Sequence, residues 1–178
     1  MKDDIRREMR NLRAHFTGIN RAEADKKLTE NFLKTFCGYQ SYFVYNSFGT
    51  EADTSLIIKR LLSLGKRVYL PRVEGEKVVA APFGETKFGA FGIAEPTGQA
   101  FFGDIEITVI PLLAVNACGY RIGYGKGYYD RYFKCTKTVK VGLAYGFQIA
   151  DFKEDVWDEP LNYLVTESGV VKYEDNKR

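Results

Sequence analysis

A run of fifteen residues, 119–133, combines four glycines with three cations and one carboxylate. The glycines let the backbone turn sharply and approach another molecule closely, because no Cβ obstructs it. Arg121, Lys126 and Arg131 supply positive charge that suits a polyphosphate, and Asp130 is a hard oxygen ligand suited to magnesium. Backbone amides, cations and a metal carboxylate are together the groups that phosphoryl transfer needs. The spacing therefore predicts a phosphate-binding loop that takes part in phosphoryl transfer. Its centre, residues 123–127, is the glycine loop.

Two common phosphate-binding motifs do not describe this loop. A Walker motif requires Ser or Thr after its Gly-Lys pair, whereas Gly125 and Lys126 are followed by Gly127. A dinucleotide-binding fingerprint requires G-x-G-x-x-G, whereas residues 123–127 read G-x-G-x-G. The alternative is a flexible hairpin or surface loop, since glycine marks turns in general. The charge pattern and Asp130 argue against that alternative.

Composition and charge restrict the possible classes of protein. The chain has 178 residues, enough for one domain over 1–178 with a real core, and 45% of them are hydrophobic. A net charge of +3 suits an anionic small molecule and does not by itself argue for nucleic acid. A nucleic-acid-binding module that uses the basic first helix and the aromatics remains a rival, although the acidic residues of 151–159 count against it. His15 is the only histidine, which argues against a Ser-His-Asp or Cys-His mechanism.

The same sequence predicts a soluble cytoplasmic protein. No apolar run approaches the roughly 20 residues that span a bilayer, and the charged N-terminal region lacks a signal-peptide core. The cysteines at 37, 118 and 135 are widely spaced and odd in number, as expected of reduced thiols in the cytoplasm. We expect a monomer that binds small molecules, with neither nucleic acid nor membrane as a partner.

Alternating periodicities predict the elements that must position the glycine loop. Helices are expected over 2–17, 20–38 and 53–65 and from Tyr128 to Phe133. Strands are expected over 39–47, 66–70, 77–81, 105–110, 139–144 and 161–166. Pro71 is expected to end the second of these strands, and 161–166 is expected to be the last strand of the chain. This alternation predicts an α/β layered fold with a largely parallel sheet. Such sheets bind ligands at the carboxyl ends of their strands, and the glycine loop follows a strand. Residues 82–104 are expected to form loops, some of which face the ligand.

The sequence resembles a known family, the 5-formyltetrahydrofolate cyclo-ligases, also called 5,10-methenyltetrahydrofolate synthetases. Residues 119–130 are similar to the family motif G-x-R-L-G-x-G-x-G-Y-Y-D. Supporting segments follow in the expected order over almost the whole chain: K-x-x-x-R at 2–6, E-A-D-T at 51–54, L-P-R at 70–72, E-P at 95–96 and D-E-P-L-N-Y-L-V-T-E at 158–167.

The resemblance implies a three-layer α/β/α sandwich with a largely parallel central sheet. It also implies a reaction in which 5-formyltetrahydrofolate and ATP give 5,10-methenyltetrahydrofolate, ADP and phosphate, with Mg²⁺ as cofactor and ATP as co-substrate. A formamide oxygen is a poor leaving group, so ring closure needs activation. Transfer of the γ-phosphoryl group to that oxygen gives an iminium phosphate, N10 attacks the carbon, and phosphate departs.

Carried over position by position, the resemblance assigns site residues. The catalytic residues are Arg121, Lys126 and Asp130. ATP is bound by Lys2, Arg6, Arg121, Gly123, Tyr124, Gly125, Lys126, Gly127, Tyr128, Tyr129 and Arg131. The folate is bound by Asn46, Glu51, Tyr124, Gly125, Lys126, Gly127 and Tyr128, and the metal by Asp130 and Asp158.

Each assignment outside the glycine loop has a structural alternative. Without the resemblance, Lys2 and Arg6 fit a solvated helix face better than a phosphate site, and Asp158 fits a loop carboxylate or a helix cap. Glu51 can accept two hydrogen bonds from the aminopyrimidine edge of a pterin, but it also fits a charge near a helix N-terminus.

The chain departs from the family pattern at Val115, Asn116, Trp157 and Asn162, where Phe, Asp, His and Asp are common. These departures bear on fine positioning and rate. The main rival function is a catalytically silent folate- or nucleotide-binding protein on the same scaffold. Such a protein would not need Asp130 and the basic loop, and their presence argues against it.

Overall fold

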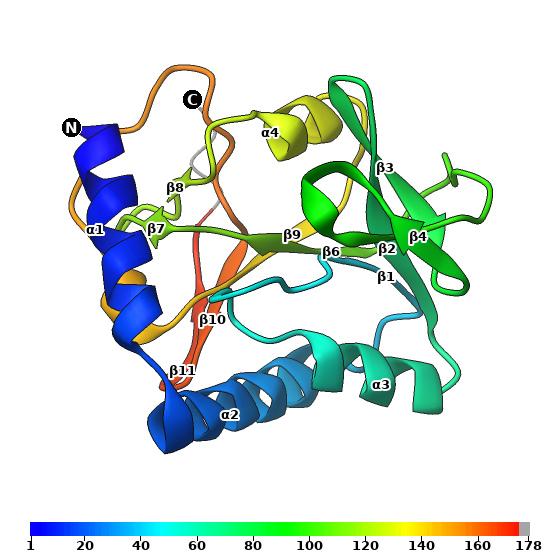
Figure 1. Cartoon of the computed structure of the whole chain (residues 1–178), viewed down its shortest axis with the longest axis horizontal. Helices are drawn as coiled ribbons and strands as arrows, with labels where there is room; N and C mark the ends of the chain where they lie inside the picture. The colour runs from blue at the N-terminus through cyan, green and yellow to red at the C-terminus, as the bar shows by residue number, and fades with distance from the viewer. Residues whose placement is uncertain (175–178) are drawn as a thin grey trace.

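A central sheet of seven strands organises the molecule (Figure 1), and the computed structural model describes residues 1–174, apart from the side chain of Ala90. The strands lie in the order β11-β10-β9-β6-β1-β2-β3. Their bounds are β1 Ser41–Val44, β2 Arg67–Glu74, β3 Lys77–Pro82, β6 Ile107–Pro111, β9 Val139–Leu143, β10 Tyr163–Thr166 and β11 Gly169–Lys172. The five inner strands pair in parallel, and β3 and β11 pair antiparallel at the two edges. The expected α/β fold with a largely parallel sheet is confirmed.

Helices cover both faces of this sheet. Helices α2 (Gly18–Phe36) and α3 (Ser55–Ser63) lie on one face, and α4 (Tyr128–Phe133) lies on the other (Figure 1). Strand β1 shows why both faces need a cover, because all four of its residues are buried. Tyr42 packs in the core with α2 and α3, whereas the next side chain, Phe43, packs against Tyr132 of α4 with ring centroids 5.0 Å apart.

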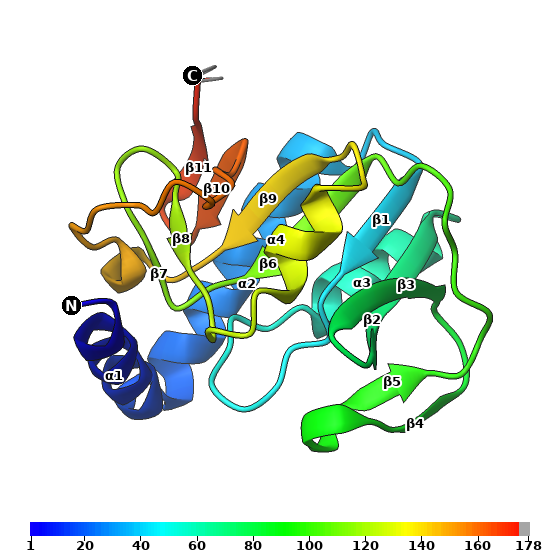
Figure 2. The same ribbon diagram turned by 90° about the horizontal axis from the view of Figure 1, so that it is seen from above.

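Helix α1 (Lys2–His15) stands at one end of the sheet rather than on a face (Figure 2). It packs beside a small two-stranded sheet made of β7 (Ala114–Val115) and β8 (Arg121–Ile122). Met9 of α1 lies in a cluster with Leu113, Tyr120 and Ile122. This contact places one long face of α1 next to the glycine loop, which follows β8 directly.

The region 82–104 contains a second small sheet. Strands β4 (Thr86–Phe88) and β5 (Ala94–Pro96) pair antiparallel around a short 3₁₀ turn, Ala90–Gly92, and project beside β2 and β3 (Figure 2). We expected a loop-rich region here and no strands, because strands of three residues leave no readable periodicity. Phe91 in the turn adopts φ 65°, a left-handed conformation that is unusual for a residue with a side chain.

Several expectations about the strands were wrong; of 39–47, for example, only Ser41–Val44 forms a strand. Strand β2 runs through Pro71 to Glu74, although Pro71 was expected to end it. Strand β1 pairs with β2 only as far as Tyr69, so Pro71 lies where β2 has one neighbour and a missing N–H is tolerated. In addition, 161–166 is not the last strand, since β11 follows after a turn. None of the helices within residues 1–174 is long and apolar enough to cross a membrane.

We predict that Phe43→Ala lowers the free energy of unfolding by about 3–5 kcal/mol, the range for removing a buried phenyl ring. Phe43 is 0% exposed and joins the sheet to α4, so its loss leaves a cavity beneath that helix. The measurement is urea unfolding followed by circular dichroism. Phe88→Ala, at a side chain that is 85% exposed, is the control. Equal losses in the two variants would contradict this account of the core.

Candidate functional site

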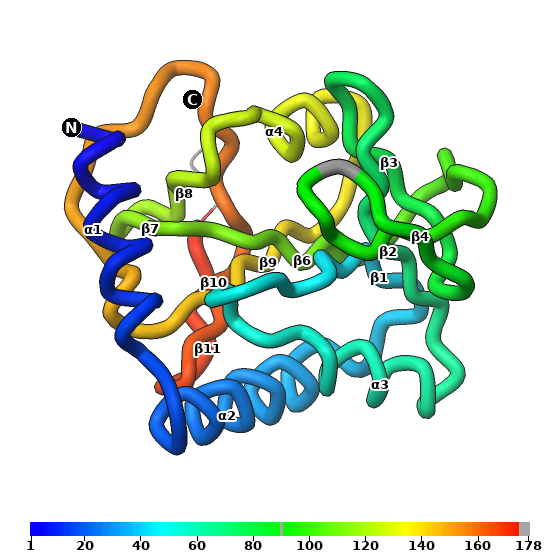
Figure 3. Tube along the Cα trace, viewed as in Figure 1, coloured from blue at the N-terminus to red at the C-terminus, as the bar shows by residue number. Residues whose placement is uncertain are grey.

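A cavity of about 890 Å³ lies between α1, the glycine loop, the loop that follows β1, and the β4–β5 hairpin. Figure 3 shows how far apart in the chain these segments are. The residues assigned from the sequence that line the cavity are Lys2, Arg6, Asn46, Glu51, Arg121, Gly123, Tyr124, Gly125, Lys126, Gly127, Tyr128, Tyr129, Asp130 and Asp158. Arg131 is the one assigned residue that is not among them. The fold therefore gathers residues from both ends of the chain around one space.

The glycine loop takes a path that only glycine permits without strain. Gly125 has φ 92° and Gly127 has φ 65°, both in the left-handed region. Gly127 is the residue immediately before α4. The guanidinium Nε of Arg6 donates to the carbonyl of Gly123 at 3.0 Å, and its Cζ lies 3.8 Å from where a Cβ on Gly125 would stand. The loop thus rests directly against a cation of α1.

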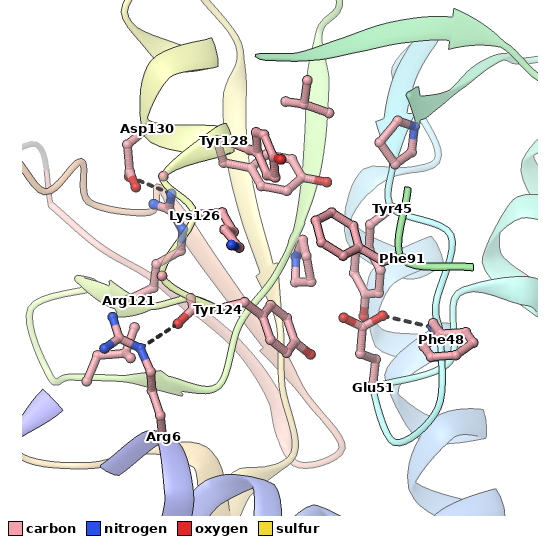
Figure 4. A pocket seen from close by; sticks show the side chains of 18 of the residues that line it. Arg6, Tyr45, Phe48, Glu51, Phe91, Arg121, Tyr124, Lys126, Tyr128 and Asp130 are labelled. Carbon is pink, nitrogen blue, oxygen red and sulfur yellow. Dashed lines mark hydrogen bonds and ion pairs between the residues drawn. The ribbon is translucent and has the colours of Figure 1, made fainter. Parts of the chain in front are cut away.

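Arg121 holds the two ends of the loop together. Its Nη2 lies 2.7 Å from Oδ1 of Asp130, and its Nη1 donates to the carbonyl of Glu159 at 3.0 Å. The guanidinium also lies over the ring of Phe133, with Cζ 5.6 Å from the ring centroid. Arg121 is only 8% exposed, and it faces the cavity from β8 (Figure 4).

Lys2 forms a second cationic point at the N-terminal end of α1. Its ammonium lies 2.7 Å from Asp155 and 2.8 Å from Asp158, and all three side chains line the cavity. Burial alone would lower the pKa of Lys2, but hydrogen bonds from its ammonium to the two carboxylates, and their charge, outweigh burial and raise that pKa. Lys2 therefore stays charged across the neutral range.

The opposite wall of the cavity carries Glu51. Figure 4 shows its carboxylate across the space from Lys126 and Asp130, and the ring of Tyr124 extends from the loop into this space. The backbone N–H of Phe48 donates to Oε2 of Glu51 at 2.8 Å. Burial raises the pKa of Glu51, although the Phe48 N–H, the Tyr124 hydroxyl and the charge of Arg13 act against this. A carboxylate so placed suits a ligand that supplies N–H donors.

Aromatic side chains from the loop and from α4 frame the cavity. Tyr124 lies beside the guanidinium groups of Arg10 and Arg13, whose Cζ atoms are 6.0 and 5.7 Å from its ring centroid. Tyr128 lies beside Arg131 in the same way, at 5.5 Å. Burial raises the pKa of both Tyr124 and Tyr129, so these hydroxyls remain protonated at neutral pH.

Two assigned residues have contacts that describe a supporting position. Arg131 donates to the carbonyls of Glu76 at 2.9 Å and Lys126 at 2.8 Å, so it braces the glycine loop from outside the cavity. Asn46 lines the cavity, and its amide donates to the carbonyl of Ala94 in β5 at 3.1 Å. Asn46 thus connects the Glu51 wall to the β4–β5 hairpin.

Several residues that line the cavity were missed from the sequence: Arg10, Arg13, Phe91, Glu95 and Asp155. Arg10 and Arg13 could have been found, because they continue the spacing of Lys2 and Arg6 along one helix face. Arg13 is only 5% exposed and donates to Oγ1 of Thr50 from both Nε and Nη2. Phe91 and Glu95 lie in 82–104, where ligand-facing loops were expected, and Glu95 belongs to the family segment at 95–96. Which side chains of that region face the cavity depends on the β4–β5 pairing, which the sequence does not show.

The chemistry of the carboxylates decides how a magnesium ion could be held. Residues 1–174 contain no group of three or more His, Cys, Asp or Glu side chains arranged to hold a metal. The expected ligands, Asp130 and Asp158, line the same cavity and are each bound to a cation of the protein. Magnesium is commonly held by one or two carboxylates together with substrate phosphates. This donor set fits an ion that enters with a nucleotide.

Asn116, a departure from the family pattern, has a clear structural role. Its Oδ1 accepts hydrogen bonds from the backbone N–H groups of Cys118 and Tyr120, at 3.1 and 3.0 Å. Its Nδ2 donates to the carbonyl of Phe152 at 3.1 Å, which an ionised Asp could not do. Asn116 therefore shapes the turn between β7 and β8 that leads into Arg121.

Known proteins resemble this chain in sequence and in fold. A protein of Mycoplasma genitalium named 5-formyltetrahydrofolate cyclo-ligase is 52% identical over 64 residues, which are 35% of this chain and 39% of that protein. A Haemophilus influenzae protein of the same name is 30% identical over 183 residues, 90% of this chain and 94% of that protein. The solved structure of the Aquifex aeolicus 5,10-methenyltetrahydrofolate synthetase is 31% identical, with a TM-score of 0.88 over 99% of this chain and 95% of that one.

The sequence pattern shared by a whole protein family also matches this chain. Residues 1–167 match the 5-formyltetrahydrofolate cyclo-ligase family, and this range contains every residue that lines the cavity. The chain therefore belongs to the 5-formyltetrahydrofolate cyclo-ligase family, ligases of folate metabolism.

Proposed function

We propose that this protein converts 5-formyltetrahydrofolate to 5,10-methenyltetrahydrofolate at the expense of ATP and with Mg²⁺, through a phosphorylated formyl intermediate. One observation carries the proposal: a single cavity has cations and a glycine loop on one wall and a partly buried carboxylate on the other. The reaction needs ATP and a folate side by side, because the γ-phosphorus must meet the formyl oxygen directly. We also expect a cytoplasmic monomer, and the thiols Cys37, Cys118 and Cys135 are all free.

The cationic wall would bind the triphosphate. Lys126 points into the space between the two walls (Figure 4), and Arg121 is fixed beside it by Asp130. Lys2 and Arg6 reach the same space from α1. Charge on the transferring phosphoryl group is spread over its equatorial oxygens, so preorganised cations stabilise the transition state. Asp130 and Asp158 would hold Mg²⁺ together with the phosphates, and the ion neutralises charge on them when bound.

The opposite wall would bind the pterin. Glu51 accepts two parallel N–H donors from the aminopyrimidine edge, and Tyr124 borders the reactive part of the folate. The formyl oxygen then attacks the γ-phosphorus and ADP leaves. N10 attacks the activated carbon, the N10 proton is lost, and the C–O bond breaks to release phosphate. The residues of this chain act by positioning and by electrostatics, and none forms a covalent bond.

The proposal is tested by following the near-ultraviolet absorbance of the methenyl product with purified protein, 5-formyltetrahydrofolate and Mg-ATP. We expect a rise that requires both ATP and magnesium. A folded protein that binds the folate without any such rise would instead be a silent binding protein on this scaffold. If the protein instead bound nucleic acid with an affinity that falls steeply as the salt concentration rises, it would be a nucleic-acid-binding module.

We predict that Asp130→Ala lowers turnover by at least about a hundredfold, the loss typical of removing one preorganised electrostatic group. Asp130 is the ion-pair partner of Arg121, so its removal frees that guanidinium as well as removing a metal ligand. Folate affinity, measured by calorimetry, should change little because Glu51 lies on the other wall. Asp104→Ala, at an exposed carboxylate, is the control. Unchanged turnover in Asp130→Ala would show that the metal assignment is wrong.

Glu51→Gln should raise the KM for 5-formyltetrahydrofolate by about tenfold or more, while the KM for Mg-ATP stays within about twofold. An amide presents one acceptor and one donor, so it cannot accept both N–H groups of an aminopyrimidine. Steady-state kinetics with each substrate varied in turn separates the two constants. A rise of equal size in both KM values would show that Glu51 does not bind the pterin.

Glu51→Gln should also stabilise the ligand-free protein at neutral pH. Burial raises the pKa of Glu51, so the folded state prefers the protonated acid. The stability gained from that form is fully present below pH 4.5, the ordinary value for Glu, and is lost as pH rises through the folded pKa. The variant should therefore melt at a higher temperature than wild type at pH 7, with a difference that shrinks toward pH 4.5. A lower melting temperature at pH 7, by calorimetry, would contradict this.

A further inference from the structure

The loop that carries Glu51 is held from behind by an arginine outside the cavity. Arg21 lies in the first turn of α2, and its Nη2 donates to two loop carbonyls, Gly49 at 3.0 Å and Glu51 at 2.9 Å. The second of these belongs to the backbone of Glu51 itself. Arg21 does not line the cavity, so it cannot touch a ligand there. Any effect of Arg21 on binding must pass through the loop.

Arg21 is itself fixed by the core. Its Nε donates to the hydroxyl of Tyr145 at 3.3 Å and lies 3.7 Å from the carboxylate of Asp25. Tyr145 is fully buried, stacks on Phe147 with centroids 5.6 Å apart and meets the edge of Phe16 at 4.8 Å. A tyrosine held by packing on two sides is a rigid reference point for the guanidinium.

The same network also reaches the far end of the loop. The hydroxyl of Tyr145 donates to Oδ1 of Asp25 at 2.7 Å, and that oxygen also accepts the backbone N–H of Asp53 at 3.1 Å. Arg21 therefore holds the loop at residues 49 and 51, and Asp25 holds it at residue 53. At the first of these points, Gly49, the backbone is left-handed, at φ 61°. The loop also has hydrogen bonds of its own, from the N–H of Glu51 to the carbonyl of Phe48 at 3.2 Å and from the N–H of Phe48 to Oε2 of Glu51 at 2.8 Å. Arg21 fixes this turn against α2.

Position matters here because a carboxylate accepts two parallel hydrogen bonds only within narrow limits, about 0.5 Å and 10–20°. We propose, resting on the role proposed above for Glu51, that Arg21 is a positioning residue for folate binding. By holding the backbone carbonyl of Glu51 against α2, Arg21 sets the position and orientation of the Glu51 carboxylate in the cavity. Asp25 and Tyr145 orient Arg21 for this task.

The test measures the binding of two ligands to the full chain by calorimetry: 5-formyltetrahydrofolate, and a non-hydrolysable ATP analogue with magnesium. The variants are Arg21→Gln, Arg21→Lys, Glu51→Gln and the double variant Arg21→Gln/Glu51→Gln. Lys27→Gln, at an exposed cation on the same helix, is the matched control. Melting temperatures show which variants are folded, and Arg21→Lys keeps the charge should Arg21→Gln fail to fold.

We expect Arg21→Gln to weaken folate binding about tenfold, the loss expected when a charge-assisted hydrogen bond disappears, with the ATP analogue unaffected. The folate affinity of Arg21→Lys should lie between those of the wild type and Arg21→Gln, because one ammonium cannot reproduce the geometry of the guanidinium. In the double variant, Arg21→Gln should add little to the effect of Glu51→Gln, since both act on one contact.

Three results would overturn the inference, each in a distinguishable way. Unchanged folate affinity in Arg21→Gln, with weakened binding in Glu51→Gln, leaves the role of Glu51 intact and refutes that of Arg21. Equal losses for both ligands, or full additivity in the double variant, show that Arg21 only supports the fold. Unchanged folate binding in Glu51→Gln means that the proposed role of Glu51 has failed, and the role of Arg21 fails with it.

Discussion

The organisation of the site depends on one buried guanidinium, that of Arg121. A charge that is 8% exposed is costly unless it is paired, and Asp130 at 2.7 Å and the Glu159 carbonyl at 3.0 Å provide that pairing. These bonds connect β8 to α4 and to the segment that follows residue 150. The glycine loop between Arg121 and Asp130 is therefore closed at its base. Within the loop, Arg6 and Arg131 hold the carbonyls of Gly123 and Lys126 along the left-handed path that brings the backbone and Lys126 to the cavity.

The same principle explains how several cations share one wall of the cavity. Lys2 is neutralised by Asp155 and Asp158, and Arg6 by Asp3. These carboxylates lower the repulsion between the like charges of this wall, although Asp3 and Asp155 are largely exposed. In the function that we propose, phosphates and magnesium would replace part of this internal pairing. Helix α1 then serves both walls, because Lys2 and Arg6 lie at one end of it and Arg13 reaches the Glu51 loop from the other.

Much of this arrangement was predictable from sequence, and the rest was not for physical reasons. The helix–strand alternation and the glycine motif predicted the parallel sheet and α4 from Tyr128 to Phe133, because these features are local patterns. Lys2, Glu51 and Asp158, by contrast, were assigned only through the resemblance to the family. Strands β4 and β5 were missed, since three-residue strands exist only through their pairing. Strand β2 continues past Pro71 because of which neighbours it has, not because of its own sequence. The place of Arg131 outside the cavity and the burial of Arg13 depend on tertiary contacts that spacing cannot show.

The most direct test of the central claim follows the formyl oxygen. If the two walls bring the γ-phosphorus and the formyl oxygen into contact, this oxygen must leave as part of phosphate. We would incubate 5-formyltetrahydrofolate carrying ¹⁸O in its formyl group with Mg-ATP and the protein, and analyse the released phosphate by mass spectrometry. The account predicts one ¹⁸O atom in each inorganic phosphate formed with the methenyl product. Methenyl product accompanied by unlabelled phosphate, with the label in water, would contradict it.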